Sequence, residues 1–242
     1  MKKALYIVAA LLCMGCAKEN RWDCFKSSGD EETETRTLGR FNRVFVEDRI
    51  DVEYYHSEEY RVEVVFGENI IELIKTKVEN EDLKISNNTT CNVVRDLSKH
   101  PLVKIYAPTF DYLENRSSGD ITFFDTLRSV VFTYEQWESN GVASFLVENE
   151  LTQIIMHVGF CEVTVKGTTD RAELYSAAVG KLEARNLISP GAFVNNTSIQ
   201  DLTVYAEDYL YAEINSRGNI KYAGDPNTID QAVNGEGNLI PF

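Results

Sequence analysis

A glycine-led repeat in the second half of the chain constrains the fold more than any other feature. Glycine, one further residue and an apolar residue recur together, as in the stretch SRGNIKYAG at 216–224. The triplets begin at Gly119, Gly141, Gly159, Gly180, Gly218 and Gly237. Their separations of 22, 18, 21, 38 and 19 residues indicate a unit of about 20 residues, with Ser198 standing where the long gap lacks its glycine.

Each unit contains two short segments in which apolar and polar residues alternate. Ile121 and Phe123 follow the first glycine, and Val130 and Phe132 come about halfway to the next one. Alternation with period two predicts strands with one buried face. Two such strands per unit predict one rung of a parallel β-solenoid, whose inward side chains are buried only when rungs stack. In this interpretation each glycine provides a positive φ at a corner of the rung.

An antiparallel β-sandwich is the alternative fold, because its hairpins also repeat short strands at regular spacing. The hairpin dipeptide Asn-Gly occurs at 140–141 and 234–235, whereas Asp-Gly does not occur. The regular length of the unit favours the solenoid.

The strand pattern begins near Phe41, and we expect a single all-β domain over 41–242. Repeat rungs are expected over 117–242, preceded by N-terminal strands over 41–116. Within that first part the segment 68–78 differs, because its isoleucines and Val78 are spaced as on one face of a helix. The sequence therefore predicts one short helix among the N-terminal strands.

The N-terminus has the pattern of an export signal. Two lysines precede an apolar run that ends at Gly15-Cys16, and the run is too short to span a bilayer. A small residue followed by cysteine is typical of a bacterial lipoprotein, which predicts a signal peptide over 1–15, a lipid on Cys16 and a polar tether over 16–40. An ordinary secretory signal with a chance cysteine remains the alternative. Ala17, rather than aspartate, follows Cys16 and favours the outer membrane.

Three further cysteines remain after the signal region. Cys24 and Cys91 lie in polar segments without periodicity, whereas Cys161 lies in an alternating strand pattern. Export permits a disulfide. We expect Cys24 and Cys91 to pair, and Cys161 to be buried as a small hydrophobic side chain.

The net charge is −14, and loss of Lys2 and Lys3 with the signal would bring it to −16. Such a charge argues against binding nucleic acid, whose phosphates require lysine and arginine. It also argues against adsorption on anionic lipid, so membrane contact is expected through the N-terminal lipid only.

No catalytic, metal or cofactor motif is present in the sequence. The three histidines, His56, His100 and His157, lack the spacing of metal ligands. Some polysaccharide-active enzymes use acids on the outer face of a solenoid, and Asp120, Glu162 and Glu183 are the residues that could fall at successive rungs. Scattered acids are expected at this net charge, so we expect no enzyme, no metal and no cofactor.

One pattern of aromatic residues suggests a binding surface. Tyr175, Phe193 and Tyr211 are 18 residues apart and follow His157 at the same interval. If their neighbours in each strand point inward, the three rings form an outward column with one ring per rung. Such rings can stack on sugars or on a protein partner. The alternative is a ladder that only stabilises the solenoid.

Several segments resemble one known family. GRFNRVFVEDRIDVEYY, EDLKISN, LVKIYAPTFDYLENRSSGDITF and INSRGNIKYAGDP are similar to the DUF2807 family of bacterial envelope proteins, which is common in Bacteroidetes. That family is labelled as auto-transporter adhesins with a head GIN domain, and Gly-Asn-Ile at 218–220 matches the GIN-like signature. The resemblance covers roughly Phe41 to the C-terminus and implies a β-solenoid-like fold and an envelope location.

These observations together predict a non-enzymatic, lipid-anchored envelope protein that binds a glycan or a protein. A self-associating envelope scaffold, which would form homo-oligomers, is the first alternative, and a polysaccharide-active enzyme is the second.

Overall fold

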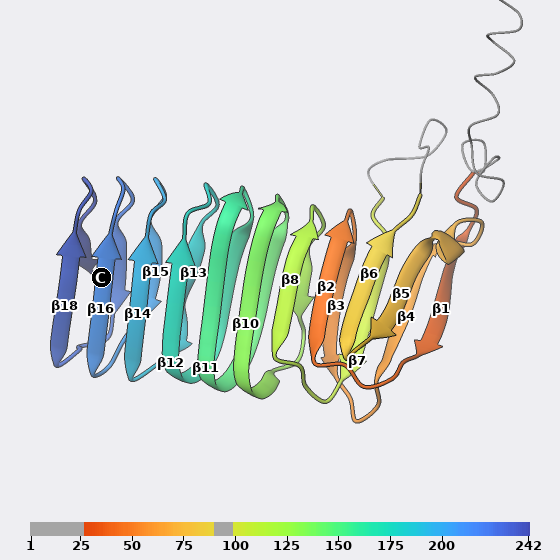
Figure 1. Cartoon of the computed structure of the whole chain (residues 1–242), viewed down its shortest axis with the longest axis horizontal. Helices are drawn as coiled ribbons and strands as arrows, with labels where there is room; N and C mark the ends of the chain where they lie inside the picture. Colours follow the sequence, from red (N-terminus) through yellow and green to blue (C-terminus); the bar gives the residue numbers. More distant parts are fainter. Residues whose placement is uncertain (1–26, 90–98) are drawn as a thin grey trace, which may run out of the picture.

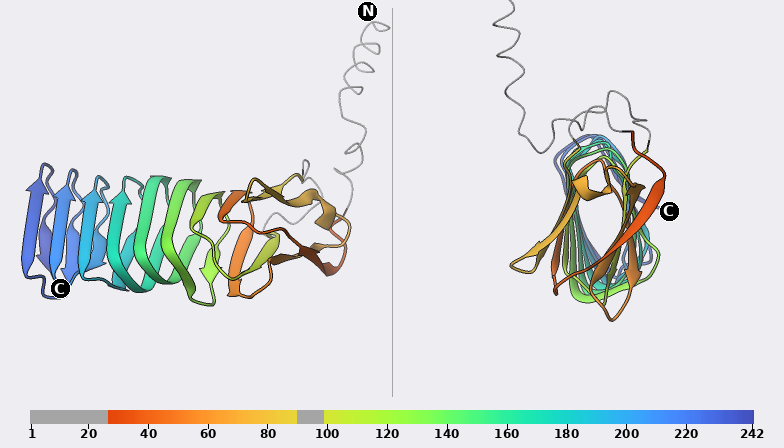
Figure 2. Two further views of the ribbon diagram at one scale, coloured as in Figure 1. Left: turned by 60° about the horizontal axis from the view of Figure 1, so that its bottom comes forward. Right: turned by 90° about the vertical axis from the view of Figure 1, so that its right-hand side faces the viewer.

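The strands of this chain stack one after another along a single long axis (Figure 1). The structure is a computed structural model and describes residues 27–89 and 99–242. Viewed along the axis, successive turns of the chain superimpose as a flattened tube with two long walls (Figure 2). This arrangement is the parallel β-solenoid that the 20-residue unit predicts.

The strands of the N-terminal part are β1 Glu31–Thr37, β2 Arg43–Asp48, β3 Asp51–His56, β4 Arg61–Gly67, β5 Ile74–Glu79, β6 Asp82–Asn87, β7 Leu102–Ala107, β8 Tyr112–Ser117 and β9 Ile121–Phe123. The strands of the repeat rungs are β10 Leu127–Ser139, β11 Val142–Gly159, β12 Glu162–Ser176, β13 Leu182–Ile188, β14 Gly191–Asn196, β15 Leu202–Tyr205, β16 Tyr209–Ile214, β17 Ile220–Ala223, β18 Thr228–Val233 and β19 Leu239–Pro241.

The two walls are two sheets. Sheet A contains β2, β6, β8, β10, the second halves of β11 and β12, β14, β16 and β18. Sheet B contains β3, β7, β9, the first halves of β11 and β12, β13, β15, β17 and β19. Every pairing from β8 onward is parallel, which excludes the antiparallel sandwich.

The glycines stand where the backbones of neighbouring rungs approach closely. A Cβ atom on Gly180 would lie 1.8 Å from the carbonyl oxygen of Cys161, and one on Gly218 would lie 2.0 Å from that of Gln200. Neither glycine has a positive φ. The expected reason for the glycines, a positive φ at each corner, is therefore wrong for these positions, because the constraint is the carbonyl of the preceding rung.

The register also corrects two assignments within the repeat. Glu162 pairs with Val142, so Cys161 rather than Gly159 stands beside Gly141. Gly159 lies two residues outside that column and has a φ of 125°. Leu202 pairs with Ile220, so Gln200 rather than Ser198 occupies the position of the missing glycine. Turns of unequal length cause both shifts.

The polar residue after several of these glycines forms a ladder between rungs. The Asp51 carboxylate accepts the Asp120 N–H at 2.9 Å, and the Asp120 carboxylate accepts the Val142 N–H at 2.8 Å. Nearer the C-terminus, Asp201 accepts the Asn219 N–H at 2.9 Å, and Asn219 accepts the Asn238 N–H at 2.9 Å. These bonds satisfy turn N–H groups, and they explain why Asp or Asn so often follows the glycine.

The N-terminal end of the solenoid departs from the parallel pattern. β4 pairs antiparallel with both β1 and β7, and β5 pairs antiparallel with β6. The helix expected over 68–78 is wrong: residues 68–70 form a turn, Ile71–Leu73 forms one 3₁₀ turn, and β5 begins at Ile74. The hairpin with β6 provides the backbone hydrogen bonds of β5, and Asn80 and Glu81 turn the chain with positive φ.

Part of the segment expected to be a polar tether, 16–40, is a strand. β1 alternates Glu and Thr with Arg36, and its burial pattern is mostly exposed. The Arg36 guanidinium donates to the carbonyl oxygens of Ile71 and Ile74, at 3.3 and 2.6 Å. A charged, exposed strand suits the end of a sheet, because it discourages further strand pairing.

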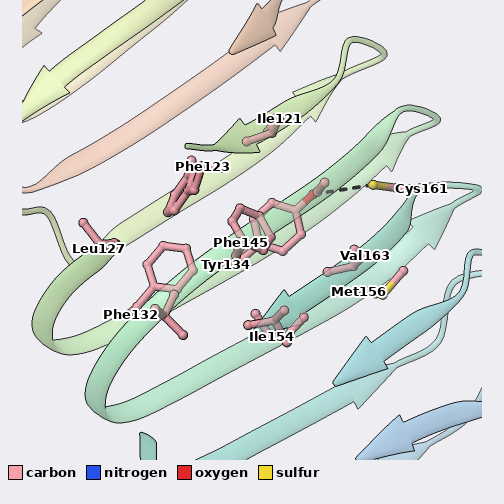
Figure 3. Close-up of a cluster of buried hydrophobic side chains, with 14 of the residues drawn as sticks. Ile121, Phe123, Leu127, Phe132, Tyr134, Phe145, Ile154, Met156, Cys161 and Val163 are labelled. Carbon is pink, nitrogen blue, oxygen red and sulfur yellow. Dashed lines mark hydrogen bonds between the residues drawn. The ribbon is translucent and has the colours of Figure 1, made fainter. Parts of the chain in front are cut away.

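Aromatic side chains fill the middle of the tube (Figure 3). The Phe145 ring lies 4.9 Å from Phe123, 5.4 Å from Phe132 and 4.7 Å from Tyr134, measured between centroids. Cys161 is buried and free, as the strand pattern predicts, with its Sγ 3.7 Å from the Tyr134 hydroxyl. Burial raises the pKa of this thiol.

Two sequence-based predictions lie outside the described residues. Cys16, the expected lipid anchor, and the expected pair Cys24 and Cys91 all fall there. Within 27–89 and 99–242, no helix has the length and hydrophobicity needed to cross a bilayer.

Candidate binding face

The three predicted aromatic residues lie on the outer side of sheet A. Tyr175 on β12, Phe193 on β14 and Tyr211 on β16 are each half-buried, and the residues on either side of each are buried. They therefore point outward from three neighbouring strands, because successive side chains of a strand alternate between its faces.

The three rings do not form one column. Phe193 pairs with Tyr211, and their ring centroids are 6.4 Å apart. Tyr175 pairs with Asn195, so Tyr175 lies two residues further along its strand. Paired residues of β12 and β14 are 20 positions apart in the sequence, whereas those of β14 and β16 are 18 apart. Residues at a constant interval of 18 therefore do not stay in one column.

Tyr175 joins a different group of rings. Trp137 on β10 stacks on His157 of β11 with centroids 3.7 Å apart, and His157 lies 6.2 Å from Tyr175. His157 is the residue that begins the 18-residue series in the sequence. The structure places it on the outer side of sheet A, where it is half-buried.

A carboxylate organises this first group. Glu135 accepts hydrogen bonds from Tyr112 Oη at 2.5 Å, His157 Nε2 at 2.8 Å and Trp137 Nε1 at 3.1 Å. Burial raises the pKa of Glu135, but these donors outweigh burial and hold it below its ordinary value. For Tyr112, burial and the bond to Glu135 both raise the pKa. Glu135 is therefore ionised at neutral pH and already has its hydrogen-bond partners.

The second group is more open and consists of tilted rings. The Phe193 ring lies 5.4 Å from Tyr209 at an interplanar angle of 49°, and its angle to Tyr211 is 35°. The Arg171 guanidinium lies 4.9 Å from the Phe193 centroid. We call these three rings, Phe193, Tyr209 and Tyr211, together with Tyr175 of the first group on the neighbouring strand β12, the aromatic patch.

Polar side chains surround the aromatic patch. Asn195 Nδ2 donates to Glu213 at 3.0 Å, and Tyr209 Oη donates to Asp230 at 3.0 Å. Glu173 accepts a hydrogen bond from Gln153 at 2.7 Å and pairs with Arg171. Rings with adjacent carboxylates and amides can contact both the apolar face and the hydroxyls of a sugar.

Sequence reasoning missed a second aromatic feature, on sheet B. Tyr55 stacks on Phe124 and on Tyr106, with centroids 5.2 and 5.3 Å apart and angles of 3° and 18°. The Arg61 guanidinium lies 3.6 Å from the Tyr106 centroid. Rings stacked this nearly parallel suit a stabilising ladder. The pairing of β3 with β7 joins residues about 50 apart, so no local spacing could have indicated it.

The acids considered for an enzyme do not form a catalytic group. Asp120 and Glu162 are not on neighbouring rungs, because Val142 of the rung between them lies beside both. Glu183 pairs with Thr164, which is two residues past Glu162 along β12. Burial raises the pKa of Glu183, but hydrogen bonds from Lys181 and Thr203 hold it below its usual range. The expectation that the three acids fall at successive rungs is wrong.

A shallow groove lies at the turns that lead from sheet B to sheet A. Glu148, Glu150 and Asp170 line it together with uncharged residues such as Ile188. Across 27–89 and 99–242, no group of three His, Cys, Asp or Glu side chains is close enough to hold a metal ion.

The comparisons with known proteins agree with this fold. A family model described as "Putative auto-transporter adhesin, head GIN domain" (DUF2807) matches residues 40–226. This chain belongs to the DUF2807 family. A search of curated protein sequences finds no match. The label of the DUF2807 family indicates an exported or cell-envelope protein.

Solved structures share the fold at low sequence identity. A "putative adhesin" from Bacteroides fragilis has a TM-score of 0.81 and 20% identity, over 90% of this DUF2807 chain and 100% of the other. A "putative adhesin" from Parabacteroides distasonis has a TM-score of 0.68 and 18% identity, over 89% and 99%. A "putative lipid binding protein" from the same species has a TM-score of 0.64 and 19% identity, over 90% and 100%.

Proposed function

We propose that this chain is a non-enzymatic lipoprotein of the outer membrane that binds a glycan through the aromatic patch. The observation that carries the proposal is the set of tilted, half-buried rings on rigid parallel strands. Tyrosine and phenylalanine offer a large contact area and lose little rotamer entropy on binding. The adhesin label of the family supports a binding role, and the lowered pKa of Glu135 and Glu183 argues against general-acid catalysis.

Phe193→Ala combined with Tyr211→Ala should weaken glycan binding. Each lost stacking contact costs about 0.5–1.5 kcal/mol, so the two together should cost about 1–3 kcal/mol of binding free energy. A glycan array identifies the ligand, and calorimetry with that ligand measures the loss. Tyr106→Ala, in the ladder of sheet B, is the matched control and should leave affinity unchanged.

Two results would contradict the glycan proposal. One is a double variant that binds the glycan as tightly as the wild type and has the same far-ultraviolet circular dichroism spectrum. The other is specific capture of a protein ligand together with an array that finds no glycan. Tyr175→Ala should have a smaller effect than the double variant, because Tyr175 lies outside the Phe193–Tyr211 pair.

Cys16→Ser should move the protein from the membrane fraction to the soluble fraction. The physical reason is that stable attachment requires more than one lipid chain, which an acylated N-terminal cysteine provides. Detergent phase partitioning measures the change, with Cys161→Ser as a control that should partition like the wild type. Identical partitioning of Cys16→Ser and wild type would exclude the lipoprotein assignment.

Self-association is a second candidate function, and one observation favours it. Among the described residues, 27–89 and 99–242, β18 pairs only with β16 and β19 only with β17, and Ile229 and Val233 of β18 are exposed. Open strand edges can pair with another chain. Sedimentation velocity without ligand tests this function, and a monomer at every concentration would count against it.

A further inference from the structure

A line of exposed apolar side chains follows one long edge of the solenoid. We call it the apolar stripe: Val158, Phe160, Val179 and Ile199, which are 49, 65, 40 and 52% exposed. All four lie in or next to the turns that lead from sheet A to sheet B, here called the A-to-B edge. Large apolar side chains exposed together mark a contact surface more often than single ones do.

The stripe runs along consecutive rungs. The Phe160 N–H donates to the Ser139 carbonyl at 3.0 Å, and the Val179 N–H donates to the Gly159 carbonyl at 2.9 Å. The Ser198 hydroxyl, next to Ile199, donates to the Ala178 carbonyl. Neighbouring rungs of a sheet lie about 4.8 Å apart, so the stripe is continuous along the axis.

The charges of the two edges differ. The A-to-B edge carries both signs of charge: the acids are Asp120, Glu138, Glu162, Asp201 and Glu236, and the bases include Lys181 and Arg217. At the opposite edge the turns carry mainly acids: Asp111, Asp125, Glu148, Asp170, Glu207 and Asp225. The apolar stripe therefore lies on an edge of mixed charge, and a zwitterionic phospholipid surface, which has no net charge, does not repel it.

The described chain also begins at the A-to-B edge. β1 is antiparallel to β4, and β4 is antiparallel to β7, so β1 runs in the direction of the sheet B strands. Those strands start at the A-to-B edge, and β1 starts there too (Figure 1). From Cys16 to Ser27 the chain can span at most about 40 Å. A lipid on Cys16 would therefore keep the start of β1, at this edge, within about 40 Å of the bilayer.

We propose that the apolar stripe contacts a zwitterionic phospholipid surface and lays the solenoid lengthwise on the membrane. The occupant is lipid rather than a second copy, because the stripe lies on the edge from which the anchored segment leads. The acidic edge then points away from the membrane, and the outer sides of sheets A and B stand free. The proposal rests on the lipid anchor of the preceding section, and it adds a protein contact to the lipid-only attachment that the sequence predicts.

Brominated lipids, which quench tryptophan fluorescence at the bilayer surface, test the proposal. Full-length Phe160→Trp and Ile188→Trp chains are reconstituted separately in phosphatidylethanolamine–phosphatidylcholine vesicles with and without brominated chains. Ile188 is the matched control, because it is an exposed apolar residue near the opposite edge. The wild-type signal is subtracted from each. The added tryptophan at 160 should lose roughly half of its fluorescence or more, and the one at 188 should lose none.

A charge within the stripe provides the second measurement. Val179→Asp in the Phe160→Trp chain should relieve the quenching, while flotation with the vesicles continues because the lipid anchor is intact. If the chain floats with the vesicles but the tryptophans at 160 and 188 are quenched equally, or neither is quenched, the stripe contact would be overturned. The lipid anchor would still be supported. Loss of flotation in the parent chain would overturn both. The chain could also dimerise in the absence of vesicles. If Val179→Asp abolished that dimer, the stripe would be assigned to a second copy and the lipid contact would be overturned.

Discussion

Gly180→Val is expected to destabilise the solenoid strongly. The Cβ atom would lie 1.8 Å from the Cys161 carbonyl oxygen and 2.6 Å from the carbonyl carbon. Both are backbone atoms, and the next residue, Glu162, pairs with Val142 of the preceding rung. Neither rung can shift without losing parallel ladder bonds on both sides. Overpacking costs about 1–3 kcal/mol where side chains can adjust, so this rigid contact should cost about 3 kcal/mol or more.

Urea unfolding followed by circular dichroism measures this loss. Gly191→Val is the matched control: Gly191 lies in β14, and a Cβ atom there would have no neighbour within 4 Å. The control should stay within about 0.5 kcal/mol of wild type, as surface substitutions usually do. If both variants unfold at the same urea concentration, the close approach of rungs is not what requires glycine at 180.

Phe145→Ala should have an effect of similar size for a different reason. The side chain is 1% exposed and contacts three aromatic rings inside the tube. Removal of a buried phenylalanine leaves a cavity that its neighbours fill only partly, at a cost of about 3–5 kcal/mol. Phe145 lies on β11, in the middle of the stack, so neighbouring rungs on both sides lose contacts.

The same urea experiment applies to this variant, with Phe160→Ala as the control. Phe160 is 65% exposed, so its removal should change the free energy of unfolding by no more than about 0.5 kcal/mol. A Phe145→Ala chain as stable as Phe160→Ala would mean that the aromatic cluster adds little to the core. The pair of variants also separates the buried rings from the apolar stripe, whose proposed role is contact with lipid.

The 20-residue unit, and whether each strand side chain points into or out of the solenoid, follow from the sequence alone. Alternation with period two identifies the strands, and Tyr175, Phe193 and Tyr211 point outward as that alternation predicts. The burial of Cys161 follows from the same pattern. These properties depend on residues close together in the chain, so local periodicity is sufficient to infer them.

Only the tertiary structure decided which residues are neighbours across rungs. Within the repeat rungs the partner of a residue in the next rung lies 18 to 22 positions away, and this separation changes whenever a turn gains or loses a residue. For that reason Tyr175 lies beside Asn195 rather than Phe193, and Gln200 rather than Ser198 takes the glycine position. The strand at Glu31–Thr37 depends likewise on its pairing with β4, about 30 residues later in the chain. No local pattern records such a contact, because the hydrogen bonds that form it come from a distant segment.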